Sequence, residues 1–293
     1  MVAITILLSF GMAIFQSPLV AKTESDEDEL RDKYLNIMTV TKPQADMVRK
    51  IVKDKHNVQY MTRDENEIRE YTWSKDTLNN ISSMDLFIYG GTDFESWTGR
   101  FIYELKKGNL GIINISRGIR FLNDNENNVN PFYFEGINEY KIALYNIKDA
   151  IENKDPKNRD YYEQNYNKAI DEFNKKIESR KNNLEDIIFI TFDNRFDYIL
   201  ESLNANYANL ENEYIDVYIE KNKLDPKKVV IVQDGEELKD LDYWTLDPHY
   251  ELDDYNIIEL WKYYGDMSYD ELILYNIDQF NKIEKKINIE KTK

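Results

Sequence analysis

The stretch DLFIYGGTDFESW, residues 85–97, contains a strand, a turn and the start of a helix within thirteen residues. Residues 86–89 form an apolar run of the length expected for a strand that is covered on both faces. Gly90 and Gly91 follow it directly, and glycine allows a tight turn because it has no Cβ atom. We therefore expect a buried strand that leads through this turn into a helix.

The residues after the turn complete a strand, helix and strand unit. We expect Thr92 or Ser96 to cap the helix and Gly108 to end it, before a second apolar run at residues 110–115. Two consecutive strands separated by one helix predict a parallel sheet. Ligands of such sheets bind beyond the carboxyl ends of the strands, so any site is expected near residues 90–94.

Composition narrows the class of protein. The chain has 293 residues, of which 42% are hydrophobic, and it is long enough for one large domain or two lobes. Its formal charge of −17 argues against a nucleic acid partner, because phosphate binding depends on lysine and arginine. There is no cysteine for a disulfide, a thiolate zinc site, a nucleophile or a lipid anchor. The two histidines, His56 and His249, are too few for a multi-histidine metal site.

The N-terminus resembles a secretory signal. An apolar segment at residues 2–15 is shorter than a membrane-spanning helix, and it is followed by Ala21 and by an acidic stretch at residues 22–32. A basic n-region is missing, so two alternatives stay open: the true start lies upstream, or the segment remains as an anchor. We expect residues 1–33 to be a signal-like segment with an acidic linker, and the protein to be extracytoplasmic, either secreted or anchored by its N-terminus. A buried N-terminal helix is the weaker alternative.

Residues 34–155 are predicted to form an N-terminal lobe in which strands and helices alternate. A long polar loop, residues 62–74, is expected between the second strand and the helix that precedes the central stretch, and an asparagine-rich loop at residues 123–130. The other expected elements are strands at 35–40 and 58–61 and helices at 43–53, 75–80 and 136–152.

A long amphipathic helix is predicted at residues 158–180, and it lies within a linking segment at 156–182. A C-terminal lobe at 183–293 follows. Its expected elements are strands at 187–192, 229–232 and 243–246, a helix rather than a strand at 214–219, and a final helix at 269–287. The predicted fold class is α/β, with two βα lobes that have central parallel sheets and are joined by one long rigid helix.

No phosphate-binding glycine loop, serine elbow or paired-histidine helix occurs in the sequence. Instead, the order of elements resembles the substrate-binding proteins of zinc and manganese ABC transporters. Five segments carry this resemblance: residues 85–97, KDPKNRDYYEQNY at 154–166, FITFDNRFDYI at 189–199, TLDP at 245–248 and SYDELILYNI at 268–277.

The resemblance implies a cation held between the two lobes, usually by three histidines, or two histidines and a glutamate, together with one aspartate. The matching positions here are Arg69 in REYTWS, Phe132 in NPFYF, Asp193 in TFDNRF and Asp247 in TLDP. Only the aspartate ligand is retained as such. The resemblance therefore implies a degenerate metal site.

Two carboxylates without imidazoles make a poor zinc site, because they offer only hard oxygen ligands. We expect Arg69 to lie between Asp193 and Asp247 and to replace the exchangeable cation, since guanidinium groups pair with carboxylates in a bidentate manner. A weak divalent metal site remains an alternative, with His249 and Glu70 as auxiliary residues and at most Asp193, Asp247 and His249 as metal ligands.

Each of these residues also has an ordinary structural interpretation. Arg69 lies in a charged segment typical of solvent exposure. Phe132 is suited to packing between the lobes, and Asp193 to capping the next helix. His56 follows Lys55 in a predicted turn, and we expect it at the surface.

These observations predict a solute-binding protein that resembles the metal-binding component of a zinc or manganese ABC transporter, with metal binding lost or altered. The expected partner is an ABC permease, and we expect a monomer with no nucleic acid partner and no certain cofactor. An envelope interaction protein that uses the same fold as a scaffold is the alternative. A hydrolase that uses Asp193 and Asp247 is disfavoured, because no nucleophile, metal or oxyanion donor accompanies them. We therefore do not expect an enzyme.

Overall fold

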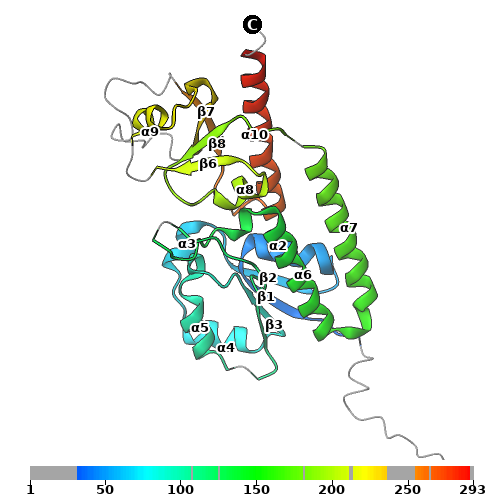
Figure 1. The fold of residues 1–293 in the computed structure, drawn as a ribbon. Helices are drawn as coiled ribbons and strands as arrows, with labels where there is room; N and C mark the ends of the chain where they lie inside the picture. The colour runs from blue at the N-terminus through cyan, green and yellow to red at the C-terminus, as the bar shows by residue number, and fades with distance from the viewer. Residues whose placement is uncertain are drawn as a thin grey trace, which may run out of the picture.

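The computed structural model describes residues 32–106, 108–124, 126–180, 182–210, 214–235, 255–263 and 265–290. Within these residues, two four-stranded parallel sheets form the centres of two lobes (Figure 1). The predicted α/β fold with two βα lobes is confirmed. The signal-like segment and the predicted strand at 243–246 lie outside the described residues.

The first sheet has the strand order β2-β1-β3-β4, and all neighbouring strands are parallel. Its strands are β2 (Asn57–Thr62), β1 (Asn36–Thr41), β3 (Leu86–Tyr89) and β4 (Gly111–Asn114). β3 lies inside the sheet, as its short apolar run predicts, and three of its four residues are buried.

Helices cover both faces of this sheet. One face packs against α2 (Lys42–Val52) and α6 (Ile137–Lys154) and forms part of a large apolar core. The opposite face packs against α4 (Lys75–Ser82) and α5 (Thr98–Glu104) and forms a smaller, separate core. The lobe therefore has three layers, as expected for a parallel sheet.

The glycine turn after β3 is closed by a buried carboxylate. Gly91 has a φ of +80°, and a Cβ atom there would collide with the side chain of Asn114. Glu95 accepts a hydrogen bond from the backbone N–H of Gly90 at 2.7 Å and another from the side chain of Gln44. Burial raises the pKa of Glu95 to about 7, although both hydrogen bonds act to lower it. Glu95 thus fixes the turn against the start of α2.

The predicted caps of the next helix are wrong. A 3₁₀ turn, η1 (Asp93–Glu95), precedes α5, and Trp97 occupies the N-cap position without a side-chain hydrogen bond. The Thr92 hydroxyl instead donates to the carbonyl of Pro131 at 3.2 Å. The turn residues are already held by Glu95 and by this contact, so Ser96 is not needed as a cap.

The long helix predicted at 158–180 is α7 (Arg159–Glu178), and it lies along α2 and α6 before the chain enters the second lobe (Figure 1). Phe173 is 3% exposed, and its ring lies 4.7 Å from that of Tyr140. Tyr166 and Ile170 are partly buried against the same core. The apolar face of α7 therefore packs against this core, as the predicted amphipathic pattern requires.

The second sheet has the order β6-β5-β7-β8, again with parallel neighbours. Its strands are β6 (Asn206–Asn209), β5 (Ile188–Thr191), β7 (Val229–Asp234) and β8 (Asn256–Leu260). The central strands β5 and β7 correspond to the strands predicted at 187–192 and 229–232. The edge strands β6 and β8 were not predicted, because edge strands need no long apolar run.

The remaining helices of the second lobe are α8 (Asp197–Ser202), α9 (Ile215–Asn222) and α10 (Tyr269–Glu290). The preference for a helix at 214–219 is confirmed by α9. The ring of Tyr269, at the start of α10, stacks on Phe134 of the first lobe at 4.8 Å, and its hydroxyl lies 3.4 Å from that of Thr41. α10 therefore packs against both lobes. None of the described helices is long and apolar enough to cross a membrane.

The surface position predicted for His56 is wrong. Its side chain is fully buried, its Nδ1 accepts a hydrogen bond from the backbone of Leu35 at 3.3 Å, and its Nε2 lies 2.6 Å from the Tyr162 hydroxyl. Tyr162 in turn donates to Asp155. Burial lowers the pKa of His56, although Asp155 acts to raise it. The imidazole therefore joins β1 to the start of α7 and is not available as a metal ligand.

Candidate functional site

A charged cleft of about 690 Å³ lies between the two lobes. The first lobe contributes the segment around α3 (Glu65–Glu70), and the second contributes the loops after β5 and β8. Seven of its ten lining residues are charged: Arg63, Asp64, Glu65, Glu67, Arg195, Lys262 and Asp266. The cleft is near the carboxyl ends of the strands, where parallel sheets bind ligands.

α3 is a helix inside the segment predicted as a polar loop. The carboxylate of Asp64 caps it by accepting a hydrogen bond from the backbone of Glu67 at 2.9 Å. Ile68 is its only buried residue, so the helix gives no apolar periodicity that the sequence could reveal. α3 places Glu65 at the wall of the cleft.

Arg195 of the second lobe forms an ion pair with Glu65 of the first lobe, with an N–O distance of 3.2 Å. The side chains are 12% and 14% exposed, so this pair is largely removed from water. The guanidinium carbon also lies 4.6 Å from the centre of the Phe132 ring, in a cation–π contact. A fixed positive charge therefore lies between the lobes, beside one of the family-matched positions.

The loop that carries Phe132 is tied to the loop that carries Arg195. Asn130 accepts a hydrogen bond from the backbone of Phe132 at 3.0 Å and donates to the carboxylate of Asp197 at 3.3 Å. Tyr198 donates its hydroxyl proton to the carbonyl of Asn130 at 3.2 Å. These contacts fix the position of the Phe132 ring relative to the Arg195 guanidinium.

Arg69 lies elsewhere than expected. It is exposed, and its Nε donates to Glu65 at 3.0 Å, one helical turn away. Its described partner is therefore Glu65 and not Asp193, because α3 directs the side chain along its own surface. Burial tends to raise the pKa of Glu65, but Arg69 and Arg195 outweigh it and lower this pKa. Glu65 is thus an ionised carboxylate held by a guanidinium from each lobe.

Asp193 is exposed at the end of β5, and it closes a turn by accepting a hydrogen bond from the backbone of Arg195 at 2.9 Å. Asp193 does not cap the next helix, because α8 begins four residues later with Phe196 at its N-cap position and no side-chain cap. Glu70 is exposed at the end of α3. Asp247 and His249 lie outside the described residues.

Glu135 is fully buried in the same region, and neither of its carboxylate oxygens has a hydrogen-bond partner among the described residues. Burial raises its pKa well above the usual value; Arg195 opposes this change, whereas Asp193 and Asp234 add to it. Burial likewise raises the pKa of Asp197 to about 7. These two acids bind protons far more readily than exposed carboxylates do.

The carboxylates around Arg195 keep its guanidinium group positively charged. Burial alone would lower its pKa, but Glu65, Asp193 and Glu135 outweigh burial and raise it. Arg63 and Lys262 add two further cations to the cleft, and Lys262 pairs with Asp234 at 3.1 Å. Within the described ranges, no group of three histidine, cysteine, aspartate or glutamate side chains is arranged to hold a metal ion.

The sequence analysis singled out Phe132 and Asp193, which both contact Arg195, but missed the pair formed by Arg195 and Glu65. Arg195 stands in the quoted segment TFDNRF, two residues after Asp193. The available signal was the position of each residue: Arg195 lies in one family-matched segment, and Glu65 lies four residues before Arg69, which lies in another. Their separation of 130 residues conceals the contact until the fold is known.

Comparison with known proteins agrees with this architecture. The sequence profile of the ZnuA family, described as zinc-uptake complex component A, periplasmic, matches residues 37–234. The chain belongs to this family. Its members are substrate-binding components of metal ABC transporters, so the resemblance stated from the sequence is confirmed.

Two curated relatives are a metal ABC transporter substrate-binding lipoprotein of Lactococcus lactis and the high-affinity zinc uptake system protein ZnuA of Bacillus subtilis. The first is 24% identical over 161 residues, which cover 52% of this chain and 51% of the relative. The second is 25% identical over 196 residues, which cover 61% of each. The match thus spans about half to three fifths of these relatives' lengths.

Solved structures share the fold. The substrate-binding protein FpvC of Pseudomonas aeruginosa, in complex with Mn²⁺, has a TM-score of 0.66 at 16% identity and covers 87% of this chain and 99% of its own. A Mn-bound periplasmic metal-binding protein of Candidatus Liberibacter asiaticus has a TM-score of 0.65 at 17% identity, and covers 86% of this chain and 100% of its own. At these identities the likeness concerns the fold alone.

Proposed function

We propose that this protein is the extracytoplasmic solute-binding component of an ABC transporter of the zinc and manganese type, with altered metal binding, and that Arg195 supplies the positive charge otherwise supplied by the cation. The observation that carries this proposal is the buried ion pair of Arg195 with Glu65 across the lobes, over the Phe132 ring. A guanidinium cannot be released, so a site arranged around one no longer needs a metal for charge balance.

The ligand chemistry supports the same proposal. A good zinc site uses imidazole or thiolate ligands, and the chain has no cysteine. His56 is committed to the buried contact with Tyr162. The largest set of metal ligands that we propose is Asp193, Asp247 and His249. A site with only these ligands would bind a divalent metal weakly.

The cleft positions Arg69, Phe132, Asp193 and Asp247 are proposed as the solute-facing surface, with Glu70 and His249 as auxiliary residues. The proposed role of Arg69 is indirect: it binds Glu65 and so orients this carboxylate toward Arg195. We also propose the boundaries 34–155, 156–182 and 183–293 for the first lobe, the link and the second lobe. An ABC permease is the proposed partner of a monomer, and solute delivery rather than catalysis is the proposed role.

Arg195→His tests the proposal directly. It removes the fixed charge and adds one imidazole beside Glu65, Glu135 and Asp193. We expect zinc to raise the melting temperature of this variant and to leave that of the parent unchanged, because a ligand that binds only the folded state stabilises it by about 2.7 kcal/mol at 100 times its Kd.

Arg180→His is the matched control. Arg180 pairs with Asp278 at 2.9 Å, away from the cleft, so an added imidazole there should give no response to zinc. A response of the parent equal to that of Arg195→His would contradict the proposal. So would a response of the control equal to that of Arg195→His, because the effect would then not depend on the cleft.

A further inference from the structure

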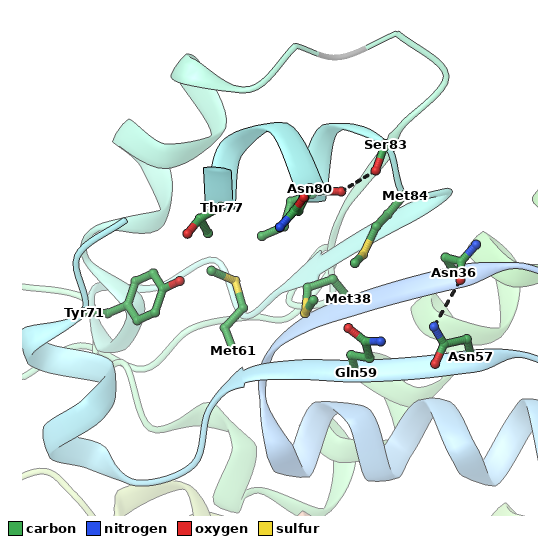
Figure 2. A pocket seen from close by; sticks show the side chains of 11 residues that line it. Asn36, Met38, Asn57, Gln59, Met61, Tyr71, Thr77, Asn80, Ser83 and Met84 are labelled. Carbon is green, nitrogen blue, oxygen red and sulfur yellow. Dashed lines mark hydrogen bonds between the residues drawn. The ribbon is translucent and has the colours of Figure 1, made fainter. Parts of the chain in front are cut away.

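A second hollow, of about 520 Å³, lies on the outer side of the first lobe and shares no lining residue with the charged cleft. β1 and β2 form its floor and α4 lies across it (Figure 2). Asn36 and Met38 of β1, and Gln59 and Met61 of β2, point to this side because alternate residues of a strand share a face. α4 leaves the face of the edge strand β2 partly open.

The lining of this hollow contains no charged side chain. In a chain with 32% charged residues and a formal charge of −17, eleven uncharged lining residues are unusual. They supply amide groups, hydroxyls, one tyrosine and three methionines. The hollow therefore suits a ligand that does not depend on a carboxylate or an ammonium group.

Three methionines gather at this place. Figure 2 shows Met38 between Met61 and Met84, with the three thioethers facing the space under α4. They come from three elements: β1, β2 and the turn before β3. Of the five methionines among the described residues, these are the three that line the hollow.

Met38, Met61 and Met84 pack against the smaller core of the first lobe, but none of the three is fully buried. Within the described chain, the buried apolar residues include many isoleucines but only one methionine, Met47. Met38, Met61 and Met84 are instead each partly exposed, and all three line the hollow. Their flexible side chains can converge on a small ligand at low cost.

We propose that this hollow is a thioether site for a soft monovalent cation, Cu(I) or its redox-stable analogue Ag(I), bound by Met38, Met61 and Met84. Thioethers are soft ligands that select Cu(I) over the harder divalent ions. A thioether needs no deprotonation to bind, so a site without acidic groups can hold a single positive charge. The amides of Asn36 and Asn57, which are 3.1 Å apart, mark the polar end of the hollow.

Titration of Ag(I) into the full chain labelled with ¹³C at the methionine methyl groups tests this proposal. We expect the methyl signals of Met38, Met61 and Met84 to shift together at one equivalent, and those of Met47 and Met267 to stay in place. Zn²⁺ and Mn²⁺ at the same concentration should not displace Ag(I). Equal shifts of all methionines, or displacement by Zn²⁺, would overturn the site.

Leucine variants separate a sulfur ligand from an apolar contact, because leucine keeps the volume and removes the sulfur. Met61→Leu should weaken Ag(I) binding at least tenfold, and the triple leucine variant should abolish it, whereas Met267→Leu should have no effect. A bicinchoninate competition assay under anaerobic conditions gives the corresponding result for Cu(I). Unchanged Ag(I) affinity in Met61→Leu would overturn the proposal even if the triple variant does not fold. Arg195→Gln, which removes the cleft cation without adding a metal ligand, should bind Ag(I) as the parent does, so this outcome is independent of the cleft.

Discussion

The two hollows of this molecule differ in charge and in the elements that form them. The cleft between the lobes is lined largely by charged residues, and its central pair joins residues that are 130 positions apart. The outer hollow belongs to one lobe and has no charged lining residue. The comparison indicates that the ion pair in the cleft contributes to holding the two lobes together, while the outer hollow is formed within the first lobe alone.

The largest difference is expected in stability. Arg195→Ala removes the cation that pairs with Glu65 across the lobes and lies near Glu135, and breaking a buried ion pair commonly costs about 3–5 kcal/mol. Arg69 still contacts Glu65, so we expect the lower part of that range in urea denaturation. Arg180→Ala, which breaks a more exposed pair, should cost less than about 1 kcal/mol. Equal costs for the two variants would contradict the importance of the cleft pair.

The second difference is expected in pH dependence. The folded-state pKa of Asp197 is about 7, above its ordinary value of 3.8, so near neutral pH the folded state retains a proton that the unfolded state has lost. Stability from this group is complete below pH of about 4 and is lost as the pH rises toward 7. The loss amounts to at most about 1.4 kcal/mol for each pH unit crossed between the two pKa values.

Asp197→Asn should therefore flatten the decline in stability between pH 5 and 8, measured by urea denaturation at each pH. Glu95 adds a parallel decline, because its folded-state pKa is also about 7, and this part should remain in the variant. The outer hollow has no carboxylate or histidine in its lining, so Ag(I) affinity should be constant over the same range. An unchanged pH profile of stability in Asp197→Asn would show that its carboxyl group does not retain this proton.

A smaller effect is expected for methionine replacement. Met61→Leu conserves volume at a partly exposed position, so the free energy of unfolding should change by less than about 1.5 kcal/mol. Urea denaturation with Met47→Leu as a buried control provides the comparison. If Met61→Leu lowered the free energy of unfolding more than Arg195→Ala does, the outer hollow would matter more for stability than the cleft, contrary to this account.

The smallest change is expected in overall shape. α7 is a helix of 20 residues packed along α2 and α6, and α10 packs against both lobes, so the lobes have little freedom to close. Small-angle scattering curves with and without Zn²⁺ should nearly superimpose for Arg195→His. A marked compaction would indicate hinge closure instead.

Much of the fold follows from local sequence patterns. The apolar run of β3, the glycine turn and the periodicity of α7 each specify an element within a short window. β6 and α3 carry no such pattern: β6 has asparagine at both ends, and α3 buries only Ile68. Such elements are stabilised by their neighbours and not by their own pattern.

The site was less predictable than the fold. Phe132 was identified through the family pattern, and the structure places it beside a guanidinium between the lobes. That guanidinium belongs to Arg195 rather than Arg69, because α3 turns Arg69 along its own surface and presents Glu65 to the second lobe. Charge accounting predicted an arginine between the lobes, and the three-dimensional arrangement shows that the arginine paired across them is Arg195.

Isothermal titration of Zn²⁺ into the metal-free full chain, with Arg195→His titrated in parallel, tests the central claim most directly. If the fixed charge of Arg195 takes the place of the exchangeable cation, the parent will show no tight binding at one equivalent, and the variant will show measurable binding. Tight binding of one Zn²⁺ by the parent would contradict the claim.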